Sequence, residues 1–228
     1  KGIKISNQNC EPIVNFYRKE NTLQPIKEKC EASHLSLINL IQAMQIKHII
    51  ILNRWSFRLF PVEDKITSLN FDNGEGGIEY VKNYREYYSK TKDGFATSGN
   101  AKKMAVKEFI NSFLDNDIKV KLIYPIPEVG WHLSKLNMIK LNFENKIPET
   151  LSTSFEVFKK RQSFAYEILD SIGDHRLLER VYPSSIFCDS ELKDRCVIQK
   201  GATPLYYDSD HLSNEGAKLF INKAALID

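Results

Sequence analysis

Hydrophobic positions follow two alternating periods along this chain, and the alternation predicts a sheet layered between helices. Apolar residues recur at helical spacing over residues 36–44, 100–114, 155–172 and 213–226. Stretches typical of strands precede these segments, at residues 1–6, 48–52, 119–124 and 176–182. Strands that alternate with helices form a parallel sheet with helices on both faces, so we expect a three-layer α/β/α fold.

The predicted sheet also indicates where a functional site lies. His48–Leu52 is a continuous apolar run, typical of a central parallel strand buried on both faces. In such sheets the active site lies at the carboxyl ends of the strands. Three segments are expected to meet there: residues 53–55, residues 125–128 and the loop before the last helix. We find no internal repeat and no low-complexity linker, so we expect residues 1–228 to form a single domain.

The loop before the last helix carries the sharpest chemical feature of the sequence. Asp208 lies three residues before His211, close enough to accept a hydrogen bond from Nδ1–H of the imidazole. That bond would fix the tautomer and leave Nε2 as a general base, a role that suits histidine because its pKa lies near neutrality. Ser213 is placed to cap the final helix, and Gly216 would let that helix pack closely. Taken alone, such a pair is more often a surface histidine beside carboxylates, and its position before the last helix of an α/β domain is what favours a catalytic role.

Composition narrows the function further. The 228 residues include 32 basic and 29 acidic side chains, a formal net charge of +3. A phosphate-binding face usually gives a large basic excess, so this balance argues against nucleic acid as a partner. No apolar run reaches the roughly 18 residues that span a bilayer. Asp208, Asp210 and His211 are too few ligands for a metal site, so no metal is expected.

The four cysteines, Cys10, Cys30, Cys188 and Cys196, lack the C-x-x-C spacing of zinc ribbons and thioredoxin-like motifs. The simplest disulfide pairing joins Cys10 to Cys30 and Cys188 to Cys196, although four cysteines allow three connectivities. Composition alone leaves oxidised and reduced cysteines equally open. Oxidised cysteines would indicate an extracytoplasmic location.

The segment from Tyr206 to Ala217 resembles the last sequence block of the SGNH hydrolase superfamily. More narrowly, the chain is similar to SGNH domains fused to membrane acyltransferases of acyltransferase family 3, which O-acetylate surface polysaccharides. The other stretches that support the resemblance are residues 49–55, 125–131, 187–196 and 201–206. The resemblance implies a flavodoxin-like SGNH fold with Asp208 and His211 as catalytic residues, and it favours the oxidised cysteines.

One block of the family pattern is absent from this sequence. The family nucleophile is a serine in a Gly-Asp-Ser-His block at the end of the first strand, and no Gly-Asp-Ser occurs here. Gly173-Asp174-His175 lacks the serine, and we interpret Ser33-His34 as surface. Either an amino-terminal piece with the first strand, the nucleophile and the first helix is missing, or the chain is a serine-free relative. We favour the first hypothesis, so we expect a fold without its first strand and a chain that is inactive alone.

The resemblance further implies a two-step acyl transfer outside the cytoplasm. A serine would take an acyl group and pass it to a hydroxyl of a polysaccharide or other glycan. The acyl group would be acetyl, derived from acetyl-CoA and delivered by the membrane acyltransferase domain of the same polypeptide. That domain would tether this one to the inner membrane on its periplasmic side. No bound cofactor is expected in the domain itself.

Three residues at the end of the strand 48–52 are candidate ligands of the substrate. Asn53 could donate a hydrogen bond to a developing oxyanion, or could be an ordinary turn residue. Arg54 and Trp55 could orient a sugar or acyl donor, although Trp55 could equally cover the core.

Two other functions stay open at this point. A free carbohydrate esterase of the same fold would use water as the acceptor with the same triad. A non-catalytic glycan-binding module would use the region Tyr80–Tyr88 and Trp55. An upstream membrane segment would favour the transferase, and a signal peptide directly upstream would favour the esterase. Glycan binding that survives His211→Ala would favour the binding module.

Overall fold

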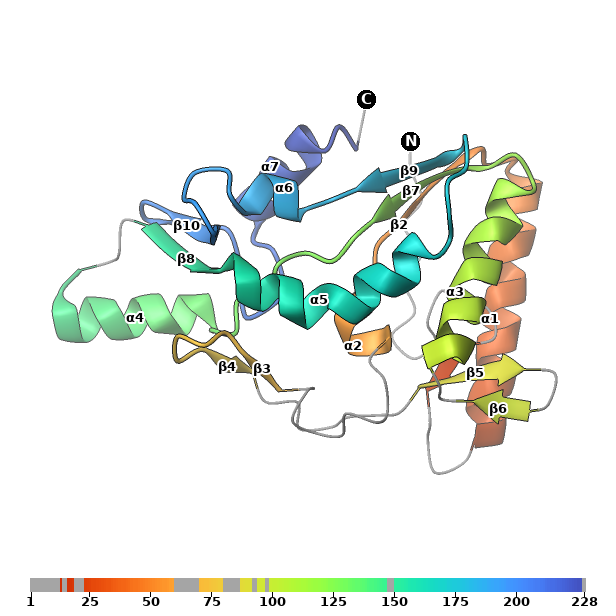
Figure 1. Cartoon of the computed structure of the whole chain (residues 1–228), viewed down its shortest axis with the longest axis horizontal. Coiled ribbons are helices and arrows are strands. Elements are labelled where there is room, and N and C mark those ends of the chain that lie inside the picture. The colour runs from red at the N-terminus through yellow and green to blue at the C-terminus, as the bar shows by residue number, and fades with distance from the viewer. Residues whose placement is uncertain are drawn as a thin grey trace.

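A parallel sheet lies at the centre of the computed structural model of this chain (Figure 1). The structure describes residues 13, 16–18, 23–59, 70–79, 87–91, 94–96, 99–146 and 150–226. Within them the sheet has the order β2 (His48–Ile51), β7 (Lys119–Ile123), β9 (Leu178–Val181). Three predicted strands are thereby confirmed, and the fourth, residues 1–6, lies outside the described residues.

Helices cover both faces of this sheet, as the alternation of patterns predicts. The helices that share a hydrophobic core with β2 and β7 are α1 (Leu23–Ala43), α2 (Trp55–Leu59), α3 (Gly99–Leu114) and α5 (Phe155–Asp170). α7 (Asn214–Lys223) lies on the opposite side of the sheet from α5 (Figure 1). The predicted α/β fold, with a parallel sheet between helices, is confirmed.

Successive side chains of β7 contact the helical layers on the two faces of the sheet. Val120 and Leu122 are completely buried in the core that α3 and α5 share. Lys121 points to the other face because side chains alternate along a strand. Its Nζ donates to the carbonyl oxygen of Ala225, just beyond α7, at 2.7 Å. The strand therefore links the two helical layers.

The prediction for β2 is only half right. The strand pairs in parallel with β7, but Ile50 is 50% exposed and Leu52, just after the strand, is 52% exposed. Among the described strands β2 has β7 as its one neighbour, so its outer edge is unpaired there. The expectation of a strand buried on both faces is therefore wrong, because a continuous apolar run does not distinguish a central strand from an edge.

α1 is longer than the apolar pattern indicated. It begins at Leu23 rather than near Ser36, and it includes Ser33-His34. His34 is only 5% exposed, so the interpretation of this histidine as a surface residue is wrong. No helix in the described part of the chain is long and apolar enough to cross a membrane.

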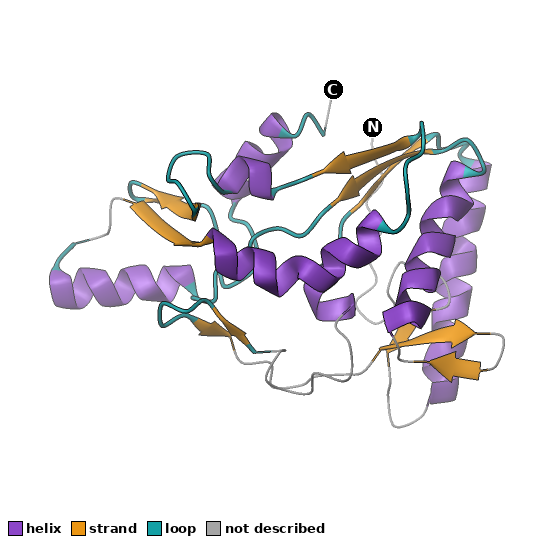
Figure 2. Ribbon diagram, viewed as in Figure 1, coloured by secondary structure: helices purple, strands orange, loops and turns teal. Residues whose placement is uncertain are grey.

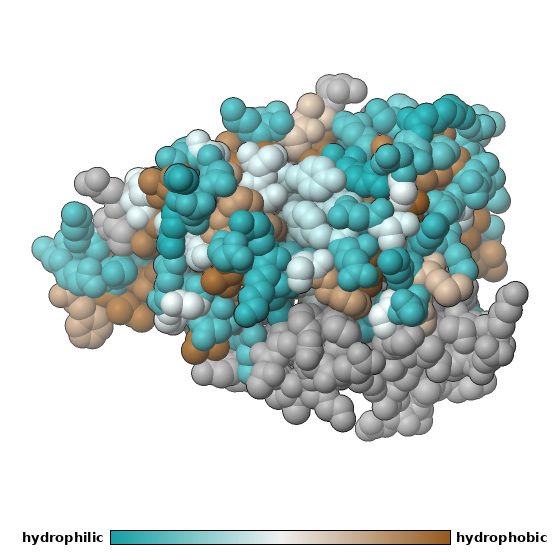
Figure 3. Space-filling view, in the orientation of Figure 1, coloured by the Kyte–Doolittle hydropathy of each residue, from teal (hydrophilic) through white to brown (hydrophobic). Residues whose placement is uncertain are grey.

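Smaller elements surround the central sheet (Figure 2). The further strands form three antiparallel groups: β8 (Thr150–Ser154) with β10 (Arg195–Lys200) and β11 (Thr203–Pro204), β1 (Phe16–Arg18) with β5 (Tyr87–Thr91) and β6 (Gly94–Ala96), and β3 (Phe71–Asp72) with β4 (Ile78–Glu79). The remaining helices are α4 (Leu133–Glu144) and α6 (Ser184–Phe187). α4 extends away from the sheet, and apolar side chains gather over it in Figure 3. Met138, Ile139 and Phe143 are exposed apolar residues of this helix.

Candidate active site

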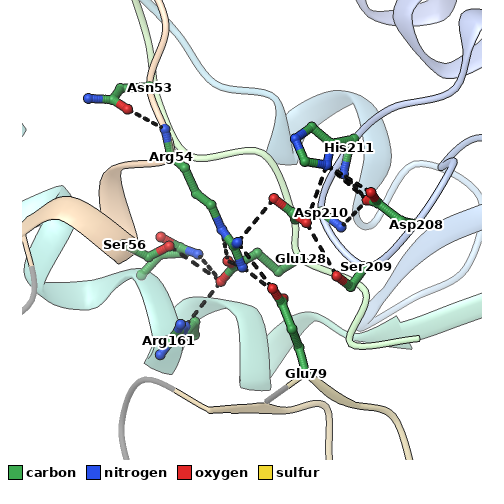
Figure 4. A network of polar contacts seen from close by, with 11 residues as sticks. Asn53, Arg54, Ser56, Glu79, Glu128, Arg161, Asp208, Ser209, Asp210 and His211 are labelled. Atoms are coloured by element: carbon green, nitrogen blue, oxygen red, sulfur yellow. Dashed lines mark hydrogen bonds and ion pairs between the residues drawn. The ribbon is translucent and has the colours of Figure 1, made fainter. Parts of the chain in front are cut away.

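Asp208 and His211 lie against each other in the loop that precedes α7 (Figure 4). Nδ1 of His211 is 2.9 Å from Oδ2 and 3.0 Å from Oδ1 of Asp208. Oδ1 also accepts the backbone N–H groups of His211 at 2.8 Å and Asp210 at 3.1 Å. This geometry suits the tautomer with its hydrogen on Nδ1, which leaves Nε2 able to accept a proton. The His211 side chain is 72% exposed, so the ring is accessible to a reactant.

The two carboxylates beside the imidazole differ in their electrostatic state. Partial burial acts to raise the pKa of Asp208, but the backbone N–H groups of Asp210 and His211 and the imidazole hold it below its usual value. Burial raises the pKa of Asp210, with Glu79 and Asp208 adding to the effect and Arg54 opposing it. Asp208 is therefore the more firmly ionised of the two, as a carboxylate that orients an imidazole should be.

Backbone hydrogen bonds hold the loop at the carboxyl end of β7. The N–H of Val129, in the segment that follows β7, donates to the carbonyl oxygen of Ser209 at 2.7 Å. Within the loop, the N–H of Tyr207 donates to the carbonyl oxygen of His211 at 2.8 Å. The pair thus lies at the carboxyl edge of the parallel sheet, where this class of fold places its sites.

α7 begins directly behind the loop, where two small residues set its position. Ser213 caps the helix: its Oγ accepts the N–H of Gly216 at 3.1 Å and donates to the carbonyl oxygen of Pro204 at 2.7 Å. A Cβ atom on Gly216 would lie 1.9 Å from the carbonyl oxygen of Leu205, so a glycine is needed for this close approach. The predicted cap and the predicted close packing are both confirmed.

Arg54 joins the His211 loop to two distant parts of the chain through three carboxylates (Figure 4). Its Nη1 lies 3.1 Å from Oδ2 of Asp210. Nη1 and Nη2 donate to the two oxygens of Glu79 at 3.1 and 2.8 Å. Nε donates to Oε1 of Glu128 at 2.8 Å. Because Oδ1 of Asp210 lies 3.4 Å from Nδ1 of His211, Asp210 stands between the guanidinium and the imidazole.

Glu128 anchors this carboxylate network from within the protein. Its side chain is only 4% exposed, and Oε2 accepts hydrogen bonds from Arg161 at 3.0 Å, Gln162 at 3.1 Å and Ser56 at 3.3 Å. Burial acts to raise the pKa of Glu128, but Arg161 and Arg54 hold it below its usual value. A buried carboxylate with this many donors stays ionised, because its charge is paired and hydrogen-bonded.

A groove of about 1000 Å³ opens beside the His211 ring. Its apolar lining includes Ile50 and Leu52 at the β2 side and Phe220 and Ile221 on α7. The half-exposed side chains of Ile50 and Leu52 thus face an open space rather than a packed core. An apolar surface of this kind beside an ionisable group is typical of a site that another structural element or a ligand covers.

The structure separates the three residues proposed as substrate ligands. Arg54 belongs to the carboxylate network. Trp55 is completely buried, and its Nε1–H donates to the carbonyl oxygen of Ile123 at 2.8 Å, so the residue is part of the core. Its role in orienting a substrate stays a prediction. The Oδ1 atom of Asn53 accepts the N–H of Arg54 at 2.8 Å, and its side chain points away from His211 in Figure 4. Its role as an oxyanion donor stays a prediction.

Comparison with known proteins places the chain in a family. The family model described as SGNH domain (fused to AT3 domains) matches residues 1–225. This chain belongs to that family. Among solved structures, it is similar to the periplasmic domain of a lipopolysaccharide acetyltransferase from Salmonella ser. Paratyphi A, with a TM-score of 0.55 and 15% identity over 96% of this chain and 68% of that chain. This likeness confirms the SGNH-type fold. No curated protein matches the sequence.

The SGNH domain carries the later of the two predicted disulfides. Cys188, after α6, and Cys196, on β10, are joined, with their Cα atoms 3.8 Å apart. This pairing is confirmed. The other predicted pair, Cys10 with Cys30, lies outside the described side chains.

Sequence reasoning missed most of the network that surrounds the pair in this SGNH domain. Glu128 falls in the stretch 125–131 that carried the family resemblance, and a charged residue beside a buried strand was a signal that could have identified it. Glu79 comes from the short strand β4, and no periodicity marks it. Arg161 lies on α5, where a basic residue is expected at the surface, yet its side chain is 7% exposed.

Proposed function

We propose that this SGNH domain is the acyl-transferring domain of a bacterial O-acyltransferase, acting on a hydroxyl of a cell-surface glycan. The observation that carries the proposal is the hydrogen bond between Asp208 and His211, on an exposed loop at the carboxyl edge of the sheet. The family is named for its fusion to AT3 domains, which supports a membrane acyltransferase as partner in the same polypeptide. The likeness to a lipopolysaccharide acetyltransferase domain supports a glycan as acceptor and acetyl as the acyl group.

In this proposal the nucleophilic serine is supplied by a segment of the same polypeptide outside the present sequence. The unpaired edge of β2 among the described strands supports this placement. A further parallel strand added there would end at the same edge of the sheet as His211, because the carboxyl ends of parallel strands lie together. It would also cover the half-exposed Ile50 and Leu52.

The proposed chemistry divides into two steps, each with a proton transfer at Nε2 of His211. The serine oxygen attacks the acyl carbonyl while Nε2 takes the hydroxyl proton, and that proton passes to the departing donor group to leave an acyl ester on the serine. A sugar hydroxyl then attacks this ester and loses its proton to Nε2, which returns it to the serine. Asp208 holds the ring and stabilises the imidazolium that forms in both steps.

The proposed location is outside the cytoplasm, with the domain tethered to the inner membrane by its AT3 partner. The disulfide between Cys188 and Cys196 supports this, since such bonds persist in oxidising compartments. The donor would be an acetyl group that originates from acetyl-CoA and that the membrane domain delivers. The domain described here would hold no cofactor of its own.

The experiment compares the present chain with the longer polypeptide that includes the upstream segment, using p-nitrophenyl acetate as donor. We expect little or no turnover from the present chain and clear turnover from the longer one. His211→Ala should lower that turnover by about 10³-fold, because a general base of this kind contributes on that order. His175→Ala is the matched control, since this histidine lies in the exposed turn before β9. It is therefore at the amino ends of the parallel strands, whereas His211 is at their carboxyl ends.

Three results would contradict the proposal: equal turnover from both chains, turnover that survives His211→Ala, or no Gly-Asp-Ser block in the upstream coding sequence. Addition of an oligosaccharide acceptor separates transferase from esterase. The proposal predicts acetylated sugar at the expense of free acetate, whereas release of acetate alone would indicate an esterase.

A further inference from the structure

We infer that Arg54 and Asp210 are positioning residues, which hold the imidazole of His211 in the orientation that proton transfer requires. The inference rests on the proposed function of His211 and adds residues to which that proposal gives no role. Its basis is the continuous chain of contacts that runs from the buried Glu128 through Arg54 and Asp210 to the His211 ring.

The Arg54 guanidinium has a shape that lets it bind several carboxylates at once. Its nitrogens lie within 3.1 Å of carboxylate oxygens on Asp210, Glu79 and Glu128, which come from three separate parts of the chain. A planar guanidinium can serve several carboxylates at fixed angles, which an ammonium group cannot do. Arg54 therefore fixes the position of Asp210 relative to β4 and to the segment after β7.

Asp210 links the Arg54 guanidinium to Asp208 and His211. Its carboxylate approaches Nδ1 of His211 to 3.4 Å, and its backbone N–H donates to the Asp208 oxygen that also binds the ring. Movement of Asp210 would therefore disturb both the orienting carboxylate and the imidazole. The carboxylate of Asp210 is only 11% exposed, so without Arg54 it would have to turn outward or take up a proton.

Glu128 anchors Arg54 firmly at the buried end of this chain of contacts. Glu128 is fully enclosed and held by Arg161, Gln162 and Ser56 on its far side. A buried carboxylate that accepts several hydrogen bonds is held in one arrangement, so it fixes the position of Arg54. The exposed catalytic loop is thus tied to the interior by charged side chains as well as by its backbone.

The test is the tautomer of His211 in the present chain, labelled with ¹⁵N and observed by long-range ¹H–¹⁵N correlation where the imidazole is neutral. We expect the Nδ1–H form to predominate in the wild type. Arg54→Gln should shift the ring toward the Nε2–H form that free imidazole favours in water, and Arg54→Lys should restore the wild-type signal only in part. Arg176→Gln is the control, because Arg176 pairs with Asp117 at the exposed surface and should leave the signal unchanged.

Asp210→Asn keeps the test decisive if Arg54→Gln fails to fold. Arg54 keeps Glu79 and Glu128 as partners in this variant, so the fold should persist while the tautomer still shifts. A wild-type tautomer in a folded Asp210→Asn chain would overturn the inference. In the longer polypeptide the same variant should lower kcat by about 10- to 100-fold with little change in KM, as expected for a misplaced catalytic group.

The two proposals fail in different ways. If the longer polypeptide keeps its activity in His211→Ala, the proposed function is wrong, whatever the tautomer is. If His211→Ala is inactive but Asp210→Asn has the wild-type tautomer and kcat, the proposed function stands and the positioning role of Arg54 and Asp210 is wrong.

Discussion

At the scale of single residues, the charge state of each group in the site follows from its immediate neighbours. Asp208 is stabilised as an anion by two backbone N–H groups and the imidazole, which holds its pKa low. Glu128 is more deeply buried but has two guanidinium groups beside it. The same principle accounts for both: a carboxylate stays ionised where its donors outweigh its loss of water.

Asp208→Asn tests the orienting role at this scale. An asparagine can hold the ring through either its amide oxygen or its nitrogen, and the latter selects the wrong tautomer. We expect kcat of the longer polypeptide to fall by about 10³- to 10⁴-fold with p-nitrophenyl acetate. Asp174→Asn is the control, because this carboxylate is fully exposed beside Arg180. A loss of less than tenfold in Asp208→Asn would contradict the assignment.

Glu128 makes the stability of the fold depend on pH in a defined direction. Its folded pKa lies below the ordinary value of 4.5, so ionised Glu128 stabilises the fold above pH 4.5, and this contribution is lost as pH falls below that value toward the folded pKa. At about pH 7, Glu128→Gln should lower the free energy of unfolding by about 3–5 kcal/mol, since it leaves Arg54 and Arg161 without their shared partner.

Urea unfolding of both proteins, at about pH 7 and again below pH 4.5, checks this expectation. The difference between wild type and Glu128→Gln should shrink on acidification. Glu144→Gln, at the exposed end of α4, is the matched control and should change little. A difference that grows as pH falls would show that the direction given for the Glu128 pKa is wrong.

At the scale of elements, the sequence predicts the helices and strands that a local hydrophobic pattern marks. It does not predict which distant segments pair or contact one another. The helices α3 and α5 and the strand β7 follow directly from their apolar periodicity. The antiparallel pairing of β8 with β10 joins Ser154 to Arg195, and no local pattern specifies such a partner. Asp208 and His211 could be predicted because they lie within one turn of chain, whereas Arg54 and Glu128 are separated by 74 positions.

Gly216→Ala tests how tightly α7 packs against the chain beside the loop that carries Asp208 and His211. The new methyl group would meet the carbonyl oxygen of Leu205, which is backbone and cannot move aside alone. We expect a loss of about 1–3 kcal/mol in unfolding free energy and a changed His211 signal in the ¹H–¹⁵N spectrum. Asn214→Ala, in the exposed first turn of α7, is the control. A Gly216→Ala protein as stable as the wild type would contradict the close packing of α7 on Leu205.

At the scale of the whole molecule, the sheet leaves an apolar edge and a groove beside Asp208 and His211. Ile50 and Leu52 are half-exposed on this edge, which supports the proposed further strand there. The proposed upstream strand would bring the nucleophile to the pair and complete the core at once. Stability and activity are therefore expected to increase together when that segment is present.

The longer polypeptide should be more stable than the present chain by about 2 kcal/mol or more, since it buries the remaining apolar surface of Ile50 and Leu52. Thermal unfolding should show this as a rise in Tm of roughly 4–8 °C. Leu52→Ser should cost more stability in the longer polypeptide than in the present chain. Leu192→Ser, at another partly exposed leucine, should cost the same in both. Equal effects of Leu52→Ser in the two chains would place the added strand elsewhere.

The central claim is that His211, oriented by Asp208, activates a serine that carries the acyl group. Intact-mass spectrometry of the longer polypeptide, quenched during turnover of p-nitrophenyl acetate, measures this intermediate directly. The account predicts one added acetyl group, mapped to the upstream serine and absent from His211→Ala. An unmodified serine during turnover, or the same labelling in His211→Ala, would contradict it.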